Sequence, residues 1–251
     1  MGTLEGKVGL VTGGGQGVGQ GIAFALAEEG ATLAVAGRTA SKLDTTCDEI
    51  ARRGGKAIGI ECNVKSEASL ASLVERVVKE LGTIDILVNN AQEVPLGPLL
   101  GVTEQAFEAG WESGPLATLR LMKLCHPHLK GGGCIVNLGS TAAKRWDMSN
   151  YGCYAAVKEA IRSLTQAAAC EWAKDGIRTN VVLPHASSPA LAGWIEGNPE
   201  EAAAFMATIP MGRVGDCEED IGRFVAQLCS DGSRYVNGQS IAIDGGQAHM
   251  G

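Results

Sequence analysis

The sequence predicts an α/β fold, in which a doubly wound parallel sheet carries helices on both faces. Short apolar runs alternate with helical stretches at roughly 25–30-residue spacing, which is typical of a parallel sheet covered on both sides. A glycine-rich turn follows the first run, and polar residues follow the fourth, as at the ligand-binding ends of such strands. The 251 residues with 45% hydrophobic content can bury a substantial core, and this length allows one large α/β domain or two small ones.

The first apolar run, at residues 8–12, reads as a strand. It leads through the glycine turn to a helix with one apolar stripe, which ends at Gly30. Further strands are expected at residues 32–36, 56–62, 84–88, 135–138 and 240–243, and further helices at 41–53, 66–81, about 104–124 and 151–173.

The turn between the first strand and its helix predicts a dinucleotide site. A strand, a glycine turn and a helix in this order direct backbone N–H groups and the positive helix end at a phosphate. Glycines let the backbone approach the pyrophosphate without a Cβ in the way. The residues expected to contact the cofactor here are Gly13, Gly15, Gln16, Gly17, Val18 and Gly19.

The second strand is followed by Gly37 and Arg38, where an NAD site carries an acid for the adenosine ribose. Because an arginine suits a 2′-phosphate, NADP is favoured over NAD. The alternative is that Arg38 is a solvated residue opening the next helix. Four further residues follow the third and fourth strands, where cofactor contacts are expected: Asn63, Val64, Asn90 and Ala91.

Tyr154 and Lys158 lie four residues apart on the predicted helix 151–173, so their side chains share one face. A cation near a phenol favours the phenolate, and Lys158 could therefore tune Tyr154 into a general acid/base. Taken alone, such a pair is more often an accidental exposed pair, because this spacing arises by chance.

Composition restricts the classes of partner. The chain has 28 acidic and 21 basic residues, a net charge of -7 and no run of lysine or arginine, which disfavours nucleic acids and anionic membranes. Its eight cysteines form no Cys-x-x-Cys pair and are interpreted as free thiols. His126 and His128 lack partners at metal spacing, so no metal site is expected. The N-terminal residues do not resemble a secretion signal, and a cytoplasmic location is expected.

These motifs, together with four further ones, resemble those of the short-chain dehydrogenases/reductases in order and approximate spacing over essentially the whole chain. The further motifs are Asn89-Asn90-Ala91, the strand at 135–138 leading to Ser140, Asn180 with Pro184, and Asp244-Gly245-Gly246. The resemblance implies a single Rossmann-type domain over residues 1–251 with about seven strands. It also implies hydride transfer between a carbinol carbon and NAD(P), a substrate lid at about 186–210, and a homotetramer or homodimer.

The same resemblance implies roles for individual residues. Tyr154 exchanges the proton of the substrate hydroxyl, Lys158 lowers the pKa of Tyr154 and contacts the nicotinamide ribose, and Ser140 positions the substrate oxygen. Pro184 and Ser188 are expected beside the nicotinamide. Counting residues leaves Thr141 as the reserve for Ser140.

The sequence departs from the family pattern at three places. Gln92 stands where a glycine is usual, His185 replaces the glycine after Pro184, and Gly114 with Pro115 stands where many relatives carry a helical asparagine that supports a water relay. A Gly-Pro pair should break or kink a helix. The relay is then absent or rebuilt from Ser113 or backbone groups, unless the change is only local packing.

Apolar residues of the segment 186–210, together with Trp146, Tyr151 and Trp194, suggest an apolar cleft. The expected substrate is a small molecule, a hydrophobic or cyclic secondary alcohol or its ketone. A sensor or scaffold that binds the dinucleotide without turnover is the alternative.

Overall fold

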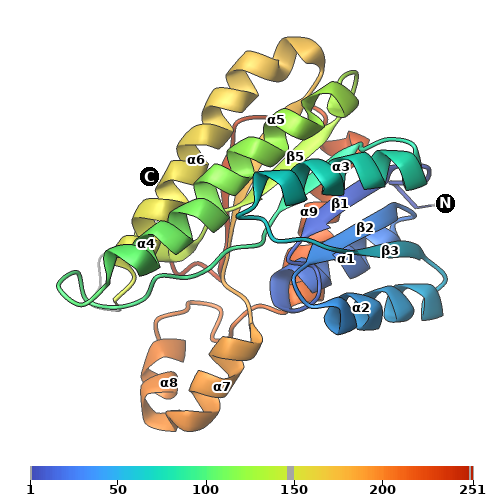
Figure 1. The fold of residues 1–251 in the computed structure, drawn as a ribbon. Helices are drawn as coiled ribbons and strands as arrows, with labels where there is room; N and C mark the ends of the chain where they lie inside the picture. The colour runs from blue at the N-terminus through green and yellow to red at the C-terminus, as the bar shows by residue number, and fades with distance from the viewer. Residues whose placement is uncertain (1, 146–149, 249, 251) are drawn as a thin grey trace.

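The computed structural model describes residues 2–145, 150–248 and 250, and they form a seven-stranded parallel sheet with helices on both faces (Figure 1). The strand order is β3-β2-β1-β4-β5-β6-β7, which confirms the predicted fold class. The strands are β1 (Val8–Thr12), β2 (Thr32–Gly37), β3 (Lys56–Glu61), β4 (Ile86–Asn89), β5 (Cys134–Leu138), β6 (Arg178–Pro184) and β7 (Ser240–Ile243).

Nine α-helices connect or extend the strands in the described part of the chain. They are α1 (Gly17–Glu28), α2 (Ala40–Arg52), α3 (Glu67–Leu81), α4 (Glu104–Trp111), α5 (Ala117–Leu129), α6 (Gly152–Trp172), α7 (Pro189–Gly197), α8 (Pro199–Met206) and α9 (Arg223–Cys229). Short π-helical turns at Glu112–Leu116 and Cys217–Gly222 lead into α5 and α9. None of the helices described is long and apolar enough to cross a bilayer.

Two hydrophobic cores hold the layers together, one on each face of the sheet. Neighbouring residues of β1 point to opposite faces, so Val11 packs in the core with α1 and α9, whereas Leu10 packs in the core with α3 and α5. Both side chains are 0% exposed. This burial on both faces explains why the strands are apolar runs without alternation.

The strand order also locates the site. β1 pairs with β2 on one side and with β4 on the other. The sheet therefore grows in one direction from β1 to β3 and in the opposite direction from β4 onward. In open α/β sheets, ligands bind beyond the carboxyl ends of the strands at such a switch point. The glycine turn after Thr12 and the polar residues after Asn89 lie together at this edge.

The pair α7 and α8 projects from the sheet edge below the other layers (Figure 1). The ring centroids of Trp194 on α7 and Phe205 on α8 lie 5.8 Å apart, and those of His185 and Phe205 lie 5.3 Å apart. Aromatic contacts thus join the two helices to the end of β6.

Candidate active site

The glycine turn is held by Asn90. The Asn90 side-chain amide donates to the carbonyl oxygens of Thr12 and Gly13, at 3.0 and 3.2 Å. A Cβ on Gly13 would lie 2.6 Å from this nitrogen and one on Gly19 2.4 Å from it, and Gly13 also has a φ of 66°. Asn90 and the glycines therefore require each other, because any side chain on either glycine would displace the amide.

The N-terminus of α1 is available for an anion. Its N-cap, Gln16, makes no side-chain capping hydrogen bond. The oxygen of the Gln16 side-chain amide instead accepts a hydrogen bond from the Lys42 ammonium. The first N–H groups of a helix have no partner within the helix. Together with the glycine cradle, they fit the pyrophosphate of a dinucleotide.

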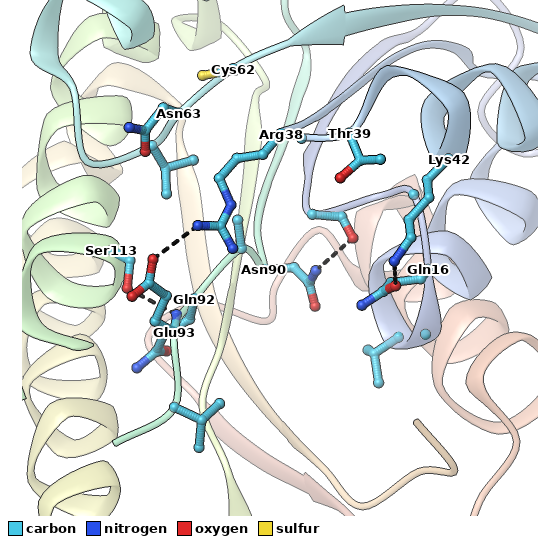
Figure 2. Close-up of a pocket in the computed structure, with 18 of the residues that line it drawn as sticks. Gln16, Arg38, Thr39, Lys42, Cys62, Asn63, Asn90, Gln92, Glu93 and Ser113 are labelled. Atoms are coloured by element: carbon cyan, nitrogen blue, oxygen red, sulfur yellow. Dashed lines mark hydrogen bonds and ion pairs between the residues drawn. The ribbon is translucent and has the colours of Figure 1, made fainter. Parts of the chain in front are cut away.

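A pocket of about 490 Å³ extends from this turn along the carboxyl edge of the sheet (Figure 2). The predicted cofactor residues that line it are Gly13, Gly15, Gln16, Gly17, Val18, Arg38, Asn63, Val64, Asn90, Ala91, Tyr154 and Ser188. Gly19, Lys158 and Pro184 are not part of its wall: Gly19 packs on the turn, Lys158 is buried behind Tyr154, and Pro184 ends β6.

Several residues of the pocket wall were missed by sequence reasoning, among them Thr39, Lys42, Lys65 and Glu93. Ser113, expected only as a possible relay residue, also lines the pocket. Lys42 lies four residues after Arg38 at the start of α2, and this spacing was the one available signal. The partnership of Lys65, Glu93 and Ser113 depends on two loops and a π-helical turn that meet only in the folded protein.

Tyr154 and Lys158 lie on the same face of α6, as their spacing predicts. The Lys158 ammonium nitrogen is 5.5 Å from the centre of the Tyr154 ring and donates to the carbonyl oxygen of Leu138 at 2.6 Å. Ser140, which follows β5, forms a side-chain hydrogen bond with Tyr154. The Ser140 hydroxyl oxygen also accepts from the Ala142 N–H at 3.2 Å. Thr141, the reserve candidate, is buried.

Burial governs the protonation of this pair. Burial raises the pKa of Tyr154 to about 12, and the hydrogen bond with Ser140 opposes that rise. Burial also lowers the pKa of Lys158 to about 7. Lys158 is not among the groups that shift the pKa of Tyr154, so the expected lowering of the phenol pKa by this amine is not found. The physical reason is that an amine only 5% exposed, with a carbonyl oxygen as its partner, holds its charge weakly near neutral pH.

The Gly-Pro pair distorts the helix without breaking it. Gly114 and Pro115 lie inside the π-helical turn Glu112–Leu116, which joins α4 to α5 in one continuous helical path. A π turn tolerates the missing backbone N–H of proline, and such turns are frequent at functional sites.

Gln92 fills the space that Gly114 leaves. A Cβ on Gly114 would lie 2.9 Å from the Gln92 amide nitrogen and 3.0 Å from the Val157 side chain. Both polar atoms of the Gln92 amide are buried without a hydrogen-bond partner among the described residues. The two departures from the family pattern therefore compensate each other sterically.

Ser113 is already engaged, which bears on its predicted role in a relay. Its hydroxyl donates to the Ala109 carbonyl oxygen at 2.6 Å and accepts from the Glu93 N–H at 2.9 Å. In this arrangement Ser113 anchors the loop after β4.

The residues predicted to contact substrate are divided between two places. The rings of Tyr151 and Tyr154 lie 5.9 Å apart, and Trp194 packs on Phe205 of α8. Trp146 lies outside the described residues.

His185 has a buried Nδ1 with no partner in the described chain, and burial lowers its pKa. Ser188 accepts from the Leu191 N–H at 3.2 Å and so caps α7.

Comparison with known proteins agrees with this geometry. A family model described as "Enoyl-(Acyl carrier protein) reductase" matches residues 13–248. The chain is 39% identical to a 12α-hydroxysteroid dehydrogenase of Clostridium sp. over 255 residues, which covers 98% of each chain.

Solved structures share the fold over nearly the whole length. One is a 7α-hydroxysteroid dehydrogenase in complex with NADH and 7-oxo glycochenodeoxycholic acid, with a TM-score of 0.91, 32% identity, and coverage of 97% of this chain and 94% of that one. Another is a variant of actinorhodin polyketide ketoreductase with NADPH, with a TM-score of 0.91, 31% identity, and coverage of 98% and 99%. With the nucleotide-binding geometry of its Rossmann-like sheet, the chain belongs to the short-chain dehydrogenase/reductase family and is an NAD(P)-dependent oxidoreductase.

Proposed function

We propose that the protein transfers a hydride between NADP(H) and a hydrophobic or cyclic secondary alcohol or its ketone, with Tyr154 as the proton-transfer group. The observation that carries this proposal is the hydrogen bond between Ser140 and Tyr154 at one end of the nucleotide pocket, with Lys158 buried behind the phenol. Two hydroxyl groups that meet at one point can together hold a single substrate oxygen.

The bound coenzyme supplies the hydride in reduction and accepts it in oxidation. In the reduction direction, the carbonyl carbon gains the hydride while its oxygen gains a proton from Tyr154. A phenol whose pKa is about 12 is fully protonated at neutral pH and is ready to donate. Ser140 donates a hydrogen bond to the same oxygen and stabilises the negative charge that develops there.

Lys158 balances the charge that Tyr154 acquires. With a pKa of about 7, the amine can take up a proton from solvent after Tyr154 has given its own proton to the substrate oxygen, and the cation then stabilises the phenolate. The carbonyl oxygen of Leu138 holds the amine in place through this change. In the oxidation direction, the same steps run backwards.

Coenzyme preference is inferred from charge at the far end of the pocket. Arg38, Lys42 and Lys65 line it, and the end of β2 presents Gly37 and Arg38 in place of an acid. A 2′-phosphate is a dianion that such a set can bind, whereas the ribose hydroxyls of NAD call for an acceptor.

The substrate class follows from aromatic residues and from relatives. Tyr151 lies beside Tyr154, and Trp194 with Phe205 forms the aromatic face of the pair α7 and α8, which we propose as the substrate lid. Rigid alicyclic or polycyclic alcohols suit aromatic contacts of this kind. The likeness to two hydroxysteroid dehydrogenases supports a ring system of this size.

The test is turnover of a panel of steroid and monocyclic alcohols and ketones, followed by the absorbance of reduced nicotinamide. Tyr154→Phe should lower kcat by about 10²- to 10⁴-fold, the usual contribution of general acid/base catalysis. Its Kd for NADPH should change less than about twofold, since the ring is retained. The matched control is Tyr235→Phe, because Tyr235 is fully exposed at 101%.

Retention of wild-type kcat in Tyr154→Phe would remove Tyr154 from the mechanism. Turnover confined to small, highly charged substrates would remove the proposed substrate class. Coenzyme binding with no turnover of any alcohol would favour the non-catalytic alternative.

A further inference from the structure

One carboxylate oxygen bridges two of the pocket's cations. The Glu93 Oε1 lies 3.1 Å from Arg38 Nη1 and 3.2 Å from Lys65 Nζ. Figure 2 shows the Arg38 side chain reaching across the pocket toward Glu93. Arg38 follows β2, Lys65 follows β3 and Glu93 follows β4, so the ion pairs join three loops at the pocket wall.

A backbone hydrogen bond fixes the position of Glu93. Its N–H donates to the Ser113 hydroxyl oxygen at 2.9 Å, and the Ser113 proton is itself committed to the Ala109 carbonyl. The preceding residue, Gln92, is wedged against Gly114. The loop is therefore docked on the π turn, which directs the Glu93 carboxylate at Arg38 and Lys65.

Charge makes this carboxylate unusual. Among the described residues that line the pocket, the cations are Arg38, Lys42 and Lys65, and Glu93 is the one acid. A phosphate that binds Arg38 and Lys65 would need the same two cations that the Glu93 carboxylate already pairs with. Like charges that share one set of donors repel each other, so the two anions compete.

We propose that Glu93 is a specificity-determining residue: an internal counter-ion that competes with the 2′-phosphate of the coenzyme and so sets the ratio of NADP to NAD affinity. This inference rests on the proposed coenzyme site and deepens it. NADP(H) must displace the carboxylate from Arg38 and Lys65. NAD(H) leaves those pairs intact, and the carboxylate then neutralises cations that would otherwise face the ribose without an anion.

Binding is measured by calorimetry with NADPH and NADH, and with the fragments 2′,5′-ADP and 5′-AMP, which lack the nicotinamide. Glu93→Gln keeps the shape of the side chain and removes its charge. The Kd for the 2′-phosphate ligands should fall by about three- to tenfold, the range expected for losing two partly exposed ion pairs. The Kd for NADH and 5′-AMP should change less than about twofold. Added salt at about 0.5 M should shrink the difference, since it screens charges at this distance.

Glu80→Gln is the matched control. It removes the same charge and an ion pair with Arg76, which lies at 2.6 Å on α3 and outside the pocket wall. The ratio of affinities should stay within about twofold of wild type. In the Arg38→Ala background, Glu93→Gln should lose at least half of its effect, because one of the contested cations is gone.

An unchanged ratio of affinities in Glu93→Gln overturns the inference. Weaker binding of the 2′-phosphate ligands also overturns it, since the carboxylate would then be holding Arg38 in its binding position. Failure of the proposed function is separable: tighter binding of NADH than of NADPH by wild type removes the coenzyme preference, and absent turnover removes the hydride transfer. The inference itself is judged only by how the ratio changes when the charge at position 93 is removed.

Discussion

Replacing Lys158 with methionine is expected to stabilise the folded protein at neutral pH, although it removes a group proposed to act in catalysis. Burial lowers the pKa of Lys158 from 10.5 to about 7. Between these pH values the unfolded chain holds a proton that the folded protein has released. The free energy of unfolding of the wild type therefore rises with pH across this range, and the penalty for burying the amine is fully present below pH 7.

The magnitude follows from the same pKa. At 1.36 kcal/mol for each pKa unit, the full penalty is about 5 kcal/mol. Methionine avoids it but gives up the hydrogen bond to the Leu138 carbonyl oxygen, worth about 1.5–3 kcal/mol for a charged donor. Lys158→Met should thus be more stable than wild type by about 2–3 kcal/mol at pH 7, which is about 5–10 °C in Tm for a chain of this size.

The assay is urea unfolding followed by tryptophan fluorescence at pH 7 and pH 10. The advantage of Lys158→Met should disappear by pH 10, where the unfolded lysine also begins to lose its proton. Lys123→Met is the control: Lys123 is exposed on α5, and the change should alter stability by less than about 0.5 kcal/mol at both pH values. A Lys158→Met protein that is less stable than wild type at pH 7, or whose difference does not vary with pH, would refute the reasoning.

Substitutions at Gly114 and Asn90, with Gln92→Ala and Gly193→Ala beside the first, test the packing around the pocket. Gly114→Ala should lower the free energy of unfolding by about 1–2 kcal/mol because its Cβ would crowd the Gln92 amide at 2.9 Å and the Val157 side chain at 3.0 Å. Gln92→Ala should recover part of that loss, since the contact with Val157 remains. Gly193→Ala on α7, where a Cβ would meet nothing within 4 Å, should be neutral or stabilising in the same urea titration; equal losses at both glycines would contradict the steric argument. Asn90→Ala removes two hydrogen bonds to the glycine turn and should cost about 1–2 kcal/mol and weaken NADPH binding by calorimetry; unchanged values of both would show that the turn holds its shape without this amide.

Much of the fold could be predicted from local pattern. The apolar run at 8–12, the glycines after it and the helix ending at Gly30 each follow from short-range chemistry, and the structure has β1 and α1 there. β6 (Arg178–Pro184) was not among the strands expected from periodicity, and only the family resemblance implied a seventh strand. Its buried residues carry two polar side chains, Thr179 and Asn180, which interrupt the apolar pattern.

Spacing along one helix also predicted that Tyr154 and Lys158 share a face, because a helix fixes which residues lie on one side. Their pKa values could not be predicted from the sequence. A chain shows that an amine is four residues from a phenol, but the depth at which both are buried depends on β5 and the loop that follows it. That burial raises the pKa of Tyr154 and lowers the pKa of Lys158.

The sequence by itself determined the αβ alternation, the glycine turn after β1 and the helical spacing of Tyr154 and Lys158, since each depends on residues within about one turn or one strand. Only the tertiary structure decided the rest of the pocket wall. Glu93 meets Arg38 across 55 positions in the chain, and Gln92 occupies the space left by Gly114. Such contacts arise because parallel strands bring the loops at their carboxyl ends to one edge, and no local pattern records which side chains meet there.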